Sequence, residues 1–265
     1  WDDISIDTLL AQNDLETRWK FNIPTLCTVV EGVNAGHLVE IGARSNVGKT
    51  SFHASMIASP KGFAAQGANC MVLCNEEGSP RVGARYLQAC TGMSLMQIKE
   101  NPKAAWDMYG KIRDNIFLKD VTGKDMGWVE SVCKSYKPDI VVLDMGDKFA
   151  TTQGFARTDE ALKANVVYAR QIAKMYECAM FYMSQLSAEA EGKIQLNQAM
   201  MEGSRTGKAA EADLMILIAK NPPVDGVDGE EESTQRHLNV VKNKLSGWHG
   251  RIICELDYRT ARYTA

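Results

Sequence analysis

The sequence predicts an α/β fold with a mostly parallel central sheet and helices on both faces. Strand-length runs that are apolar throughout alternate with longer amphipathic helical patterns, which is typical of parallel strands buried on two sides. A glycine-containing loop lies between one of these strands and the helix after it. A turn-rich acidic stretch at 221–232 joins two further strands, which we expect to be antiparallel.

Strands are expected where short apolar runs are bounded by turn residues. The segment 138–144 shows this best, because four apolar residues lead directly to Asp144. In 69–74, Cys70, Val72 and Cys74 occupy alternate positions and are expected to face the core. The expected strands are 36–41, 69–74, 115–118, 138–144, 179–184, 214–220, 237–242 and 251–256.

Helices are expected where apolar residues recur at three- and four-residue spacing. In 159–176, Leu162, Val166, Ala169 and Ala173 fall on one helical face. Pro24 marks a break after the first helix, because proline disfavours the helical conformation in the residue before it. The expected helices are 8–21, one beginning at about residue 49, 81–90, 104–114, 128–136 and 159–176.

Composition is that of an ordinary globular protein. The chain has 265 residues, of which 45% are hydrophobic and 24% charged, and this excludes a disordered, collagen-like or coiled-coil protein. No apolar run approaches the ~18–20 residues that span a bilayer. No basic segment followed by an apolar one opens the sequence, so nothing suggests secretion and we expect a cytoplasmic protein.

Charge and cysteine content narrow the function further. The formal net charge of -3 argues against a protein that coats nucleic acid through bulk positive charge, although it allows local basic loops. The 7 cysteines contain no C-x-x-C pair, and with the 4 histidines they complete no metal-binding pattern. We therefore expect reduced cysteines.

The segment from Gly42 to Thr50 carries the strongest functional signal, since a strand precedes it and a helix follows it. Backbone N–H groups of such a loop bind phosphate, the Lys49 ammonium reaches the β- and γ-phosphates, and the Thr50 hydroxyl binds Mg²⁺. Ala43 occupies the position where the G-x-x-x-x-G-K-[ST] pattern has glycine. A coincidental turn is the alternative. The expected nucleotide-binding residues are Ala43, Arg44, Ser45, Asn46, Val47, Gly48, Lys49, Thr50 and Ser51.

Acidic residues end two of the expected strands. Asp144 fits the acid that holds Mg²⁺ in phosphate-loop enzymes, and Asp147 is a competitor that lies past the strand. Glu76 and Glu77 follow the strand 69–74, where a carboxylate can orient and deprotonate the attacking water. We prefer Glu76 because it comes first after the strand, and Glu77 remains the alternative.

Together these residues resemble the RecA-like motor domain of DnaB-type replicative helicases, including the helicase part of phage primase-helicases. The resemblance covers about residues 21–263 and refines the fold class to a RecA-like P-loop NTPase core. Its motifs are an entry segment at 22–26 and 31–36, the phosphate loop 43–50, the catalytic glutamate region 75–77, the strand 140–144, the sensor strand end 183–187, the end of the second DNA loop at 202–204 and 210–214, and the arginine-finger region 241–247.

The resemblance implies a ring hexamer that hydrolyses ATP, with Mg²⁺, at subunit interfaces and moves along single-stranded DNA to unwind duplex. It implies that residues 1–21 form a linker helix that docks on the adjacent subunit and that 22–265 form the motor domain. Implied partners are single-stranded DNA, further copies of the chain, and a primase or polymerase, with no membrane. The implied location is the cytoplasm of a bacterium or of a phage-infected cell. A primase or collar domain is expected to be absent, removed, or on another chain.

Several site residues are implied by the resemblance alone. Gln185 would sense the γ-phosphate and couple it to the following loop. Lys242 and Lys244 would approach the γ-phosphate of a neighbouring subunit, with Arg251 as a possible helper. The family usually has arginine where this chain has Lys244, and lysine offers a point charge instead of a bidentate fork.

DNA contacts are expected from the loop that ends near Glu211. The stretch 186–211 holds basic residues together with a similar number of acids, so it is no basic patch. Backbone N–H groups and nearby cations would bind the phosphates. A second candidate loop follows Asp144 and contains Lys148, Arg157 and Lys163. The expected DNA-binding residues are Lys193, Gly203, Ser204, Arg205 and Lys208.

Two other functions stay open. A RecA- or RadA-like recombinase or a clock-type ATPase has the same fold and would pair or remodel strands instead of separating them. A non-motor protein, such as a loader, would bind ATP in order to assemble. Assays of strand displacement and strand exchange distinguish a helicase from a recombinase. ATP hydrolysis measured with and without single-stranded DNA distinguishes a motor from a non-motor protein.

Overall fold

The computed structural model describes residues 6, 17–151, 154–155, 157–202, 207–222 and 233–265. Its strands are β1 (Trp19–Lys20), β2 (Gly32–Val33), β3 (Leu38–Ala43), β4 (Cys70–Cys74), β5 (Ile116–Asp120), β6 (Ile140–Asp144), β7 (Ala179–Gln185), β8 (Leu214–Lys220), β9 (Gln235–Asn243), β10 (Gly250–Asp257) and β11 (Arg262–Thr264). Its helices are α2 (Pro24–Val30), α3 (Lys49–Ala58), α4 (Ser79–Thr91), α5 (Leu95–Glu100), α6 (Pro102–Tyr109), α7 (Met126–Tyr136), α8 (Thr158–Met175) and α9 (Gly207–Glu211). Short 3₁₀ turns include η1 (Arg113–Asn115) and η2 (Gly146–Lys148).

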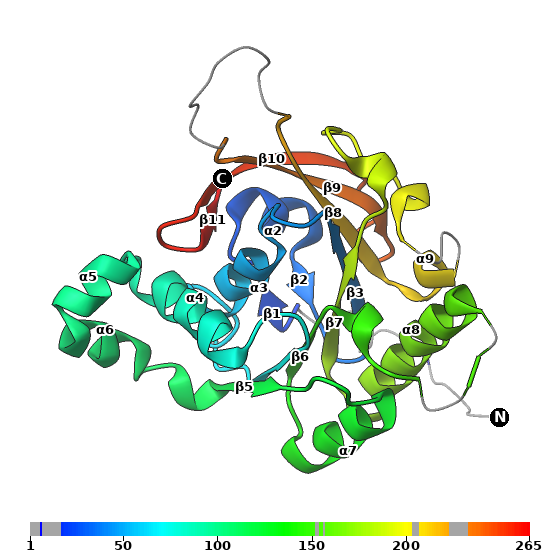
Figure 1. The fold of residues 1–265 in the computed structure, drawn as a ribbon, viewed down its shortest axis with the longest axis horizontal. Coiled ribbons are helices and arrows are strands. Elements are labelled where there is room, and N and C mark those ends of the chain that lie inside the picture. Colours follow the sequence, from blue (N-terminus) through cyan, green and yellow to red (C-terminus); the bar gives the residue numbers. More distant parts are fainter. Residues whose placement is uncertain (1–5, 7–16, 152–153, 156, 203–206, 223–232) are drawn as a thin grey trace.

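The described residues form a nine-stranded mixed sheet in the order β11-β10-β9-β8-β3-β7-β6-β4-β5 (Figure 1). From β5 to β8 the neighbouring strands are all parallel. β9, β10 and β11 continue the sheet as antiparallel strands. The predicted fold class is confirmed, including the antiparallel strands at the C-terminal end.

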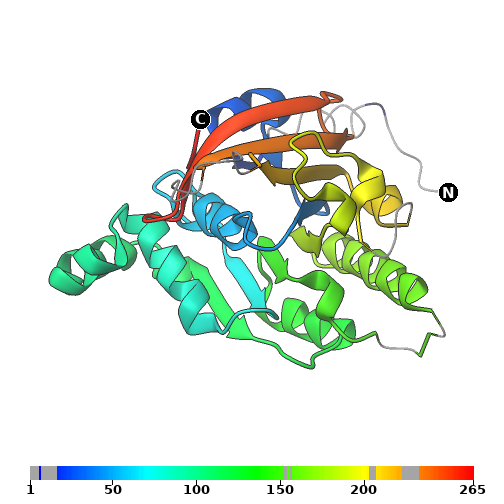
Figure 2. The same ribbon diagram turned by 45° about the horizontal axis from the view of Figure 1, so that its top comes forward.

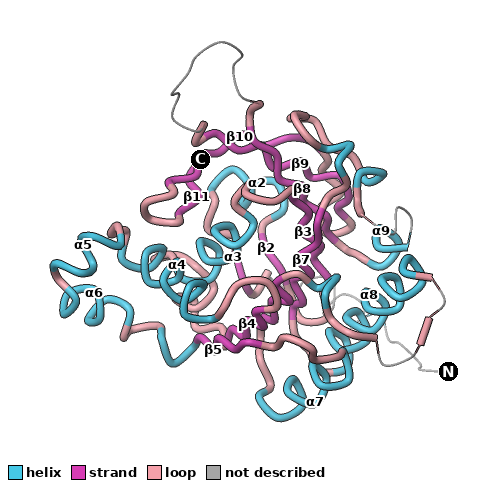
Figure 3. The backbone as a smooth tube through the Cα atoms, viewed as in Figure 1, coloured by secondary structure: helices cyan, strands magenta, loops and turns pink. Residues whose placement is uncertain are grey.

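Helices cover both faces of the sheet, as Figure 3 shows. Alternate residues of each inner strand enter two different apolar clusters, as expected for strands buried on two sides. Val72 and Phe181 face the cluster that contains α3 and α4, whereas Leu73 and Tyr182 face α7 and α8. Cys70 and Cys74 lie with Val72, as predicted, and the described cysteines are all free thiols.

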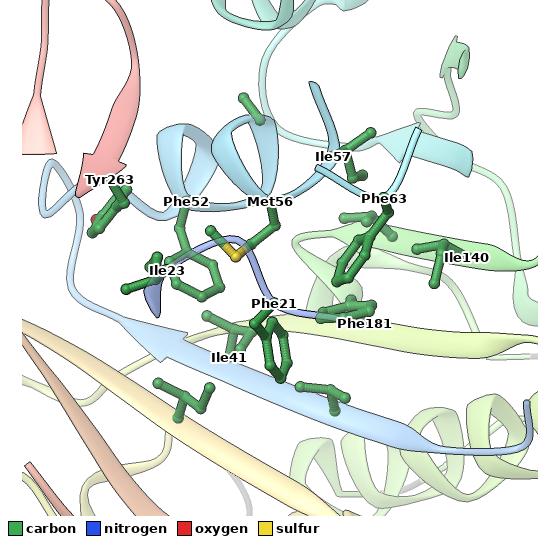
Figure 4. Close-up of a cluster of buried hydrophobic side chains, with 14 of the residues drawn as sticks. Phe21, Ile23, Ile41, Phe52, Met56, Ile57, Phe63, Ile140, Phe181 and Tyr263 are labelled. Carbon is green, nitrogen blue, oxygen red and sulfur yellow. The ribbon is translucent and has the colours of Figure 1, made fainter. Parts of the chain in front are cut away.

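Aromatic rings fill the cluster between α3 and the sheet (Figure 4). The ring centroid of Phe63 lies 5.9 Å from that of Phe21 and 5.7 Å from that of Phe181. Phe52 of α3 meets Tyr263 of β11 edge to face at 5.3 Å. Such pairs add to the stability that burial of the rings provides. They fix α3, and with it the loop that precedes α3, against the sheet.

The prediction of a helix over 8–21 is wrong for residues 17–21, the continuous part that the structure describes. Trp19–Lys20 form the strand β1, which pairs antiparallel with β2. The pairing needs glycine at position 32, because a Cβ there would lie 1.9 Å from the Trp19 carbonyl oxygen. Trp19 and Phe21 are buried in the main core. Tertiary burial therefore overrides the helical pattern, and the division at residues 21 and 22 stays a prediction.

The sequence also missed some elements and misplaced one helix end. Helix α6 ends at Tyr109, before Gly110, and the rest of the expected helix 104–114 is irregular or part of η1. Helix α5 begins with a capping box, in which the Ser94 and Gln97 side chains and backbones bond reciprocally. α5 and α6 project at one end of the molecule in both ribbon views (Figures 1 and 2). Among the described residues, no helix combines the length and apolarity needed to cross a membrane.

Candidate functional site

The loop between β3 and α3 has the left-handed backbone positions of a tight phosphate-binding turn. Asn46 has φ of 60° and Gly48 has φ of 108°. A Cβ at Gly48 would lie 2.5 Å from Leu256 and 2.8 Å from the Tyr263 hydroxyl, so only glycine fits there. α3 begins at Lys49, and the first backbone N–H groups of a helix have no partner within the helix. The loop and helix start can therefore bind an anion.

The antiparallel strands hold this loop from behind. Arg236 of β9 is fully buried, and its Nε donates to the Val47 carbonyl oxygen at 2.7 Å. The Tyr263 hydroxyl donates to the Gly48 carbonyl oxygen at 3.1 Å. The sequence did not single out Arg236, because a lone arginine in an edge-strand pattern normally points to solvent.

A pocket of about 400 Å³ opens in front of the loop. It contains most of the predicted nucleotide-binding residues together with acids and an arginine from the neighbouring strand and helix, and one aromatic ring. Ala43 and Val47 lie behind it, buried in the core. The pocket is lined by Arg44, Ser45, Asn46, Gly48, Lys49, Thr50, Ser51, Glu76, Glu77, Arg85 and Tyr258. A larger groove of about 720 Å³ runs along α8 and includes none of these residues.

Lys49 lies at the base of the pocket with weak acceptors. Its Nζ is 2.7 Å from the Met145 sulfur and 3.5 Å from the Ser184 carbonyl oxygen. Burial lowers the pKa of Lys49 below its ordinary value, and the nearby carboxylates of Glu76 and Asp144 offset only part of this effect. A thioether is a poor partner for an ammonium. A phosphate oxygen in the pocket would be a far stronger one.

Asp144, at the end of β6, is fully buried, and neither carboxylate oxygen accepts a hydrogen bond from a described residue. Burial acts to raise the pKa of Asp144, but His53, Lys49 and Arg85 together outweigh it, so the pKa is lowered. His53 Nε2 lies 3.8 Å from Asp144 Oδ1. The carboxylate is therefore charged and lacks a close partner.

These donors fit Mg²⁺. Mg²⁺ in nucleotide sites keeps several waters and takes one or two carboxylates with the substrate phosphates. Asp144 offers such a carboxylate near Lys49, and Thr50 at the start of α3 offers a hydroxyl that lines the pocket. Among the described residues, no three His, Cys, Asp or Glu side chains form a closed metal site. The competitor Asp147 is already paired, because Lys208 Nζ donates to its Oδ1 at 2.6 Å.

The two candidate bases differ in how firmly they are held. Glu77 accepts from Arg85 Nη1 at 2.7 Å, and Arg81 Nε lies 3.4 Å from the same oxygen. Glu76 has one looser contact, at 3.6 Å from Lys148 Nζ. Glu76 is thus the carboxylate that can turn toward a water, and this supports the preference for it.

Gln185 lies beside the phosphate loop. It pairs in register with Ala43, and its Nε2 is 3.5 Å from the Ser45 hydroxyl. The next residue, Leu186, accepts from Arg44 Nη1 at 2.9 Å through its carbonyl oxygen, and Arg44 Nε donates to Glu191 at 2.8 Å. The phosphate loop therefore contacts the chain that follows the predicted sensor.

Lys242 and Lys244 lie at the opposite end of the sheet from the phosphate loop. The loop follows Ala43, which is level with Ile218 of β8, whereas Lys242 is level with Met215. Lys244 is exposed, and Lys242 Nζ donates to the Ala210 carbonyl oxygen at 3.2 Å. Arg251 is exposed on β10. The two lysines therefore do not lie at the phosphate loop of their own chain.

Of the predicted DNA-binding residues, the structure describes Lys193 and Lys208, and the two differ in exposure. Lys193 is exposed, 3.9 Å from Glu189. Lys208 is fully buried, so its ammonium does not reach the surface where a DNA strand would pass. The sequence pattern around Lys208 does not distinguish a buried lysine from an exposed lysine on a loop. Gly203, Ser204 and Arg205 lie outside the described residues.

The second candidate DNA loop is described in part. Lys148 is paired with Glu76, and Arg157 donates to Asp159 at 2.8 Å. Lys163 is exposed on α8. Lys148 belongs to η2, whereas Arg157 occupies the N-cap position of α8 and Lys163 lies within that helix.

Comparisons with known proteins identify the family and agree with the fold. Residues 20–264 match the sequence model of the DnaB-like helicase C terminal domain. A DnaB-like replicative helicase, described with its interactions with primase, superposes with a TM-score of 0.82 and 16% identity, covering 100% of this chain and 68% of that one. A second solved structure, an isolated ATPase domain, superposes with a TM-score of 0.82 and 18% identity, covering 99% of both chains. Comparison with curated protein sequences finds no match.

Proposed function

The chain belongs to the DnaB-like helicase C-terminal domain family, and from this premise we propose that it is the ATP-hydrolysing motor of a ring-type replicative DNA helicase. The observation that carries the proposal is a single pocket in which the Lys49 ammonium, the exposed Glu76 and the pocket-lining Thr50 meet. The carboxylate oxygens of the buried Asp144 accept no hydrogen bond from a described residue, and the carboxylate lies close enough to Lys49 to influence the pKa of that lysine.

In the proposed reaction, the loop N–H groups and Lys49 bind the triphosphate of ATP. Thr50 and Asp144 hold Mg²⁺, which neutralises charge on the phosphates when bound. Glu76 orients the attacking water and takes its proton, while Glu77 stays bound to its arginines. The ring of Tyr258, at the pocket wall, offers a surface on which a base can stack.

Completion of the site requires a neighbouring copy. Lys244, with Lys242 beside it, would stabilise charge on the γ-phosphate of the adjacent subunit, because both lie far from the loop of their own chain. Gln185 would report the γ-phosphate to the segment after β7 through its position beside Ser45. This arrangement supports a ring in which each interface forms one ATP site.

DNA would pass the loops that follow β7. Of the expected contacts, Lys193 is the one whose side chain is described as exposed, and Gly203, Ser204 and Arg205 remain part of the proposal. We do not include Lys208, since it is buried. Binding of a primase or polymerase is proposed from the family alone.

Strand displacement on a forked DNA substrate tests the function. With ATP and Mg²⁺ the wild-type chain should release the labelled strand, and the Glu76→Gln variant should bind ATP without releasing it. Strand exchange without displacement would favour a recombinase. ATP binding with neither activity, and no effect of DNA on hydrolysis, would favour a non-motor assembly protein. Particle size with ATP and single-stranded DNA, by light scattering, should be that of a ring.

A further inference from the structure

A buried charge cluster lies behind the phosphate loop and outside the reaction just described. Lys208 of α9 is fully buried, and its Nζ donates to Asp147 at 2.6 Å and to the Ser184 hydroxyl at 3.3 Å. The Ser184 hydroxyl in turn donates to Glu40 Oε1 at 3.1 Å. Buried charges lose hydration, and a buried ion pair is therefore weak evidence of a stabilising role. The position of this cluster, among elements of the candidate nucleotide site, points to a role other than stability.

Each partner of Lys208 belongs to an element of the nucleotide site. Asp147 lies in η2, directly after the strand that ends in Asp144. Ser184 precedes Gln185, and its carbonyl oxygen lies 3.5 Å from the Lys49 ammonium. Glu40 is in β3, the strand that leads into the phosphate loop. One ammonium thus contacts η2, which follows β6, and β7 directly, and β3 through the Ser184 hydroxyl.

Helix α9 is also held at its other end. The Ala210 carbonyl oxygen accepts from Lys242, which lies next to Lys244 in the region assigned to the neighbour's site. Burial, with the charge of Lys244, lowers the pKa of Lys242. In the sequence, α9 directly follows 203–206, the segment expected to bind DNA. The helix therefore connects the chain's own candidate nucleotide site, the predicted DNA segment and the lysines proposed to act on the next subunit.

The cluster holds two carboxyl groups, Asp147 and Glu40, near the single ammonium of Lys208. Burial raises the pKa of Glu40 to about 7, the ammonium of Lys208 lowers it and the carboxylate of Asp147 raises it. One ammonium thus serves two carboxyl groups. A small movement of η2 or of β7 on nucleotide binding would change how Lys208 is shared between them, and so where α9 sits.

We propose that Lys208 is a positioning residue that couples the state of the nucleotide site to DNA affinity by anchoring α9 to Asp147, Ser184 and Glu40, and that it makes no contact with DNA. The proposal rests on the proposed function, because it requires DNA binding that depends on nucleotide.

The test measures affinity for fluorescent single-stranded oligo(dT), by anisotropy, with ADP and with a non-hydrolysable ATP analogue. For wild type we expect the two affinities to differ by roughly tenfold, within the usual range of such coupling. In Lys208→Met, which keeps the apolar stem and removes the ammonium, the two affinities should agree within about twofold, as expected when coupling is lost. Nucleotide affinity should stay near that of wild type. The matched control Lys174→Met changes an exposed lysine on α8 and should behave as wild type.

Other outcomes overturn the proposal. If Lys208 touches DNA, Lys208→Met will weaken binding equally with both nucleotides and reduce the salt dependence by about one phosphate contact. If Lys208 only supports the fold, the ratio of affinities will be retained while the unfolding temperature falls. A wild-type chain with no DNA affinity in either state would refute the proposed function itself, whatever the variant does.

A second variant covers the case in which Lys208→Met does not fold. Replacing both partners of a buried ion pair with apolar side chains often preserves stability, since neither charge of the pair is left without the other. Lys208→Met/Asp147→Leu should therefore fold, bind nucleotide and lack the difference between ADP and the ATP analogue. A double variant that retains the difference would contradict the proposal.

Discussion

His53 Nε2 lies 3.8 Å from Oδ1 of Asp144, and both side chains are buried. His53 follows Lys49 and Thr50 by about one turn on α3, and its Nδ1 lies 2.9 Å from the Tyr86 hydroxyl. The imidazole is thus fixed by α4 at one nitrogen and faces the proposed magnesium-binding carboxylate with the other. It is the described side chain that approaches this acid most closely as an ion-pair partner.

His53 should therefore tune Mg²⁺ binding. Side chains that orient a metal ligand typically contribute about 10–100-fold to metal affinity or activity. We expect His53→Ala to raise the Mg²⁺ concentration for half-maximal ATP turnover by roughly tenfold. Tyr86→Phe, which removes only the hydroxyl beside Nδ1, should have a smaller effect in the same direction. Unchanged Mg²⁺ dependence in His53→Ala would show that Asp144 is not oriented by this histidine, or does not hold the metal.

Glu76 and Glu77 should respond differently to the same substitution. Glu76→Gln should keep nucleotide affinity and lose turnover by about 10²–10⁴-fold, the usual contribution of a general base. Glu77→Gln should weaken its contacts to Arg85 and Arg81 and affect turnover much less. The pair of variants is its own control, because both remove one carboxylate from the same pocket. If Glu76→Gln turns over normally, Glu76 is not the base.

Sequence reasoning identified the residues of the proposed nucleotide site because the signals for that site are local. The strand, the loop and Lys49 are consecutive in the chain, and Asp144 ends an unmistakably apolar strand. His53 was missed because a single histidine on a helix carries no sequence pattern. Its proximity to Asp144 arises only in the folded chain, where the end of β6 lies near α3. Arg236 was missed for the same reason, since its partner Val47 is far away in the sequence.

The errors of the sequence prediction have physical causes of the same kind. Trp19–Lys20 follow a helical pattern, but burial of Trp19 and pairing with Gly32–Val33 make them a strand. The sequence around Lys208 is typical of an exposed loop, yet its ammonium is buried and forms an ion pair with Asp147. Helix α5 is short and stabilised by its cap, so its apolar periodicity was too brief to detect.

Lys244 should act on the site of a neighbouring subunit. Lys49→Ala and Lys244→Ala should each be inactive alone, because every site needs Lys49 from one chain and Lys244 from the next. An equal mixture should regain activity at about a quarter of its sites if the subunits combine at random in a symmetric ring. ATP turnover of the mixture, compared with each variant alone, measures this. A mixture no more active than its components would place Lys244 outside the shared site.

Glu40 should give the stability a distinctive pH dependence. Burial raises the pKa of Glu40 to about 7 from 4.5, with Lys208 and Lys242 lowering it and Asp147 raising it. The folded chain therefore binds this proton more tightly than the unfolded chain, and the free energy of unfolding falls as pH rises from about 4.5 to about 7. Relative to Glu40→Gln, wild type should lose about 3 kcal/mol across this window.

Urea unfolding at a series of pH values, on wild type and on Glu40→Gln, gives the difference directly. Because both chains share all other titrating groups, those contributions cancel to a first approximation. The difference should level off above about pH 7, where Glu40 is ionised in both states. A difference that is constant from about pH 4.5 to 8 would show that Glu40 titrates normally.

The rate of ATP hydrolysis with and without single-stranded DNA tests the central claim most directly, because it joins the nucleotide site to its proposed partner. The measurement uses the intact chain with Mg²⁺ and oligo(dT), and Glu76→Gln as the inactive control. We predict that DNA raises the wild-type rate severalfold and leaves the control at background. A wild-type rate that is the same with and without DNA would contradict the assignment of this chain as a DNA motor.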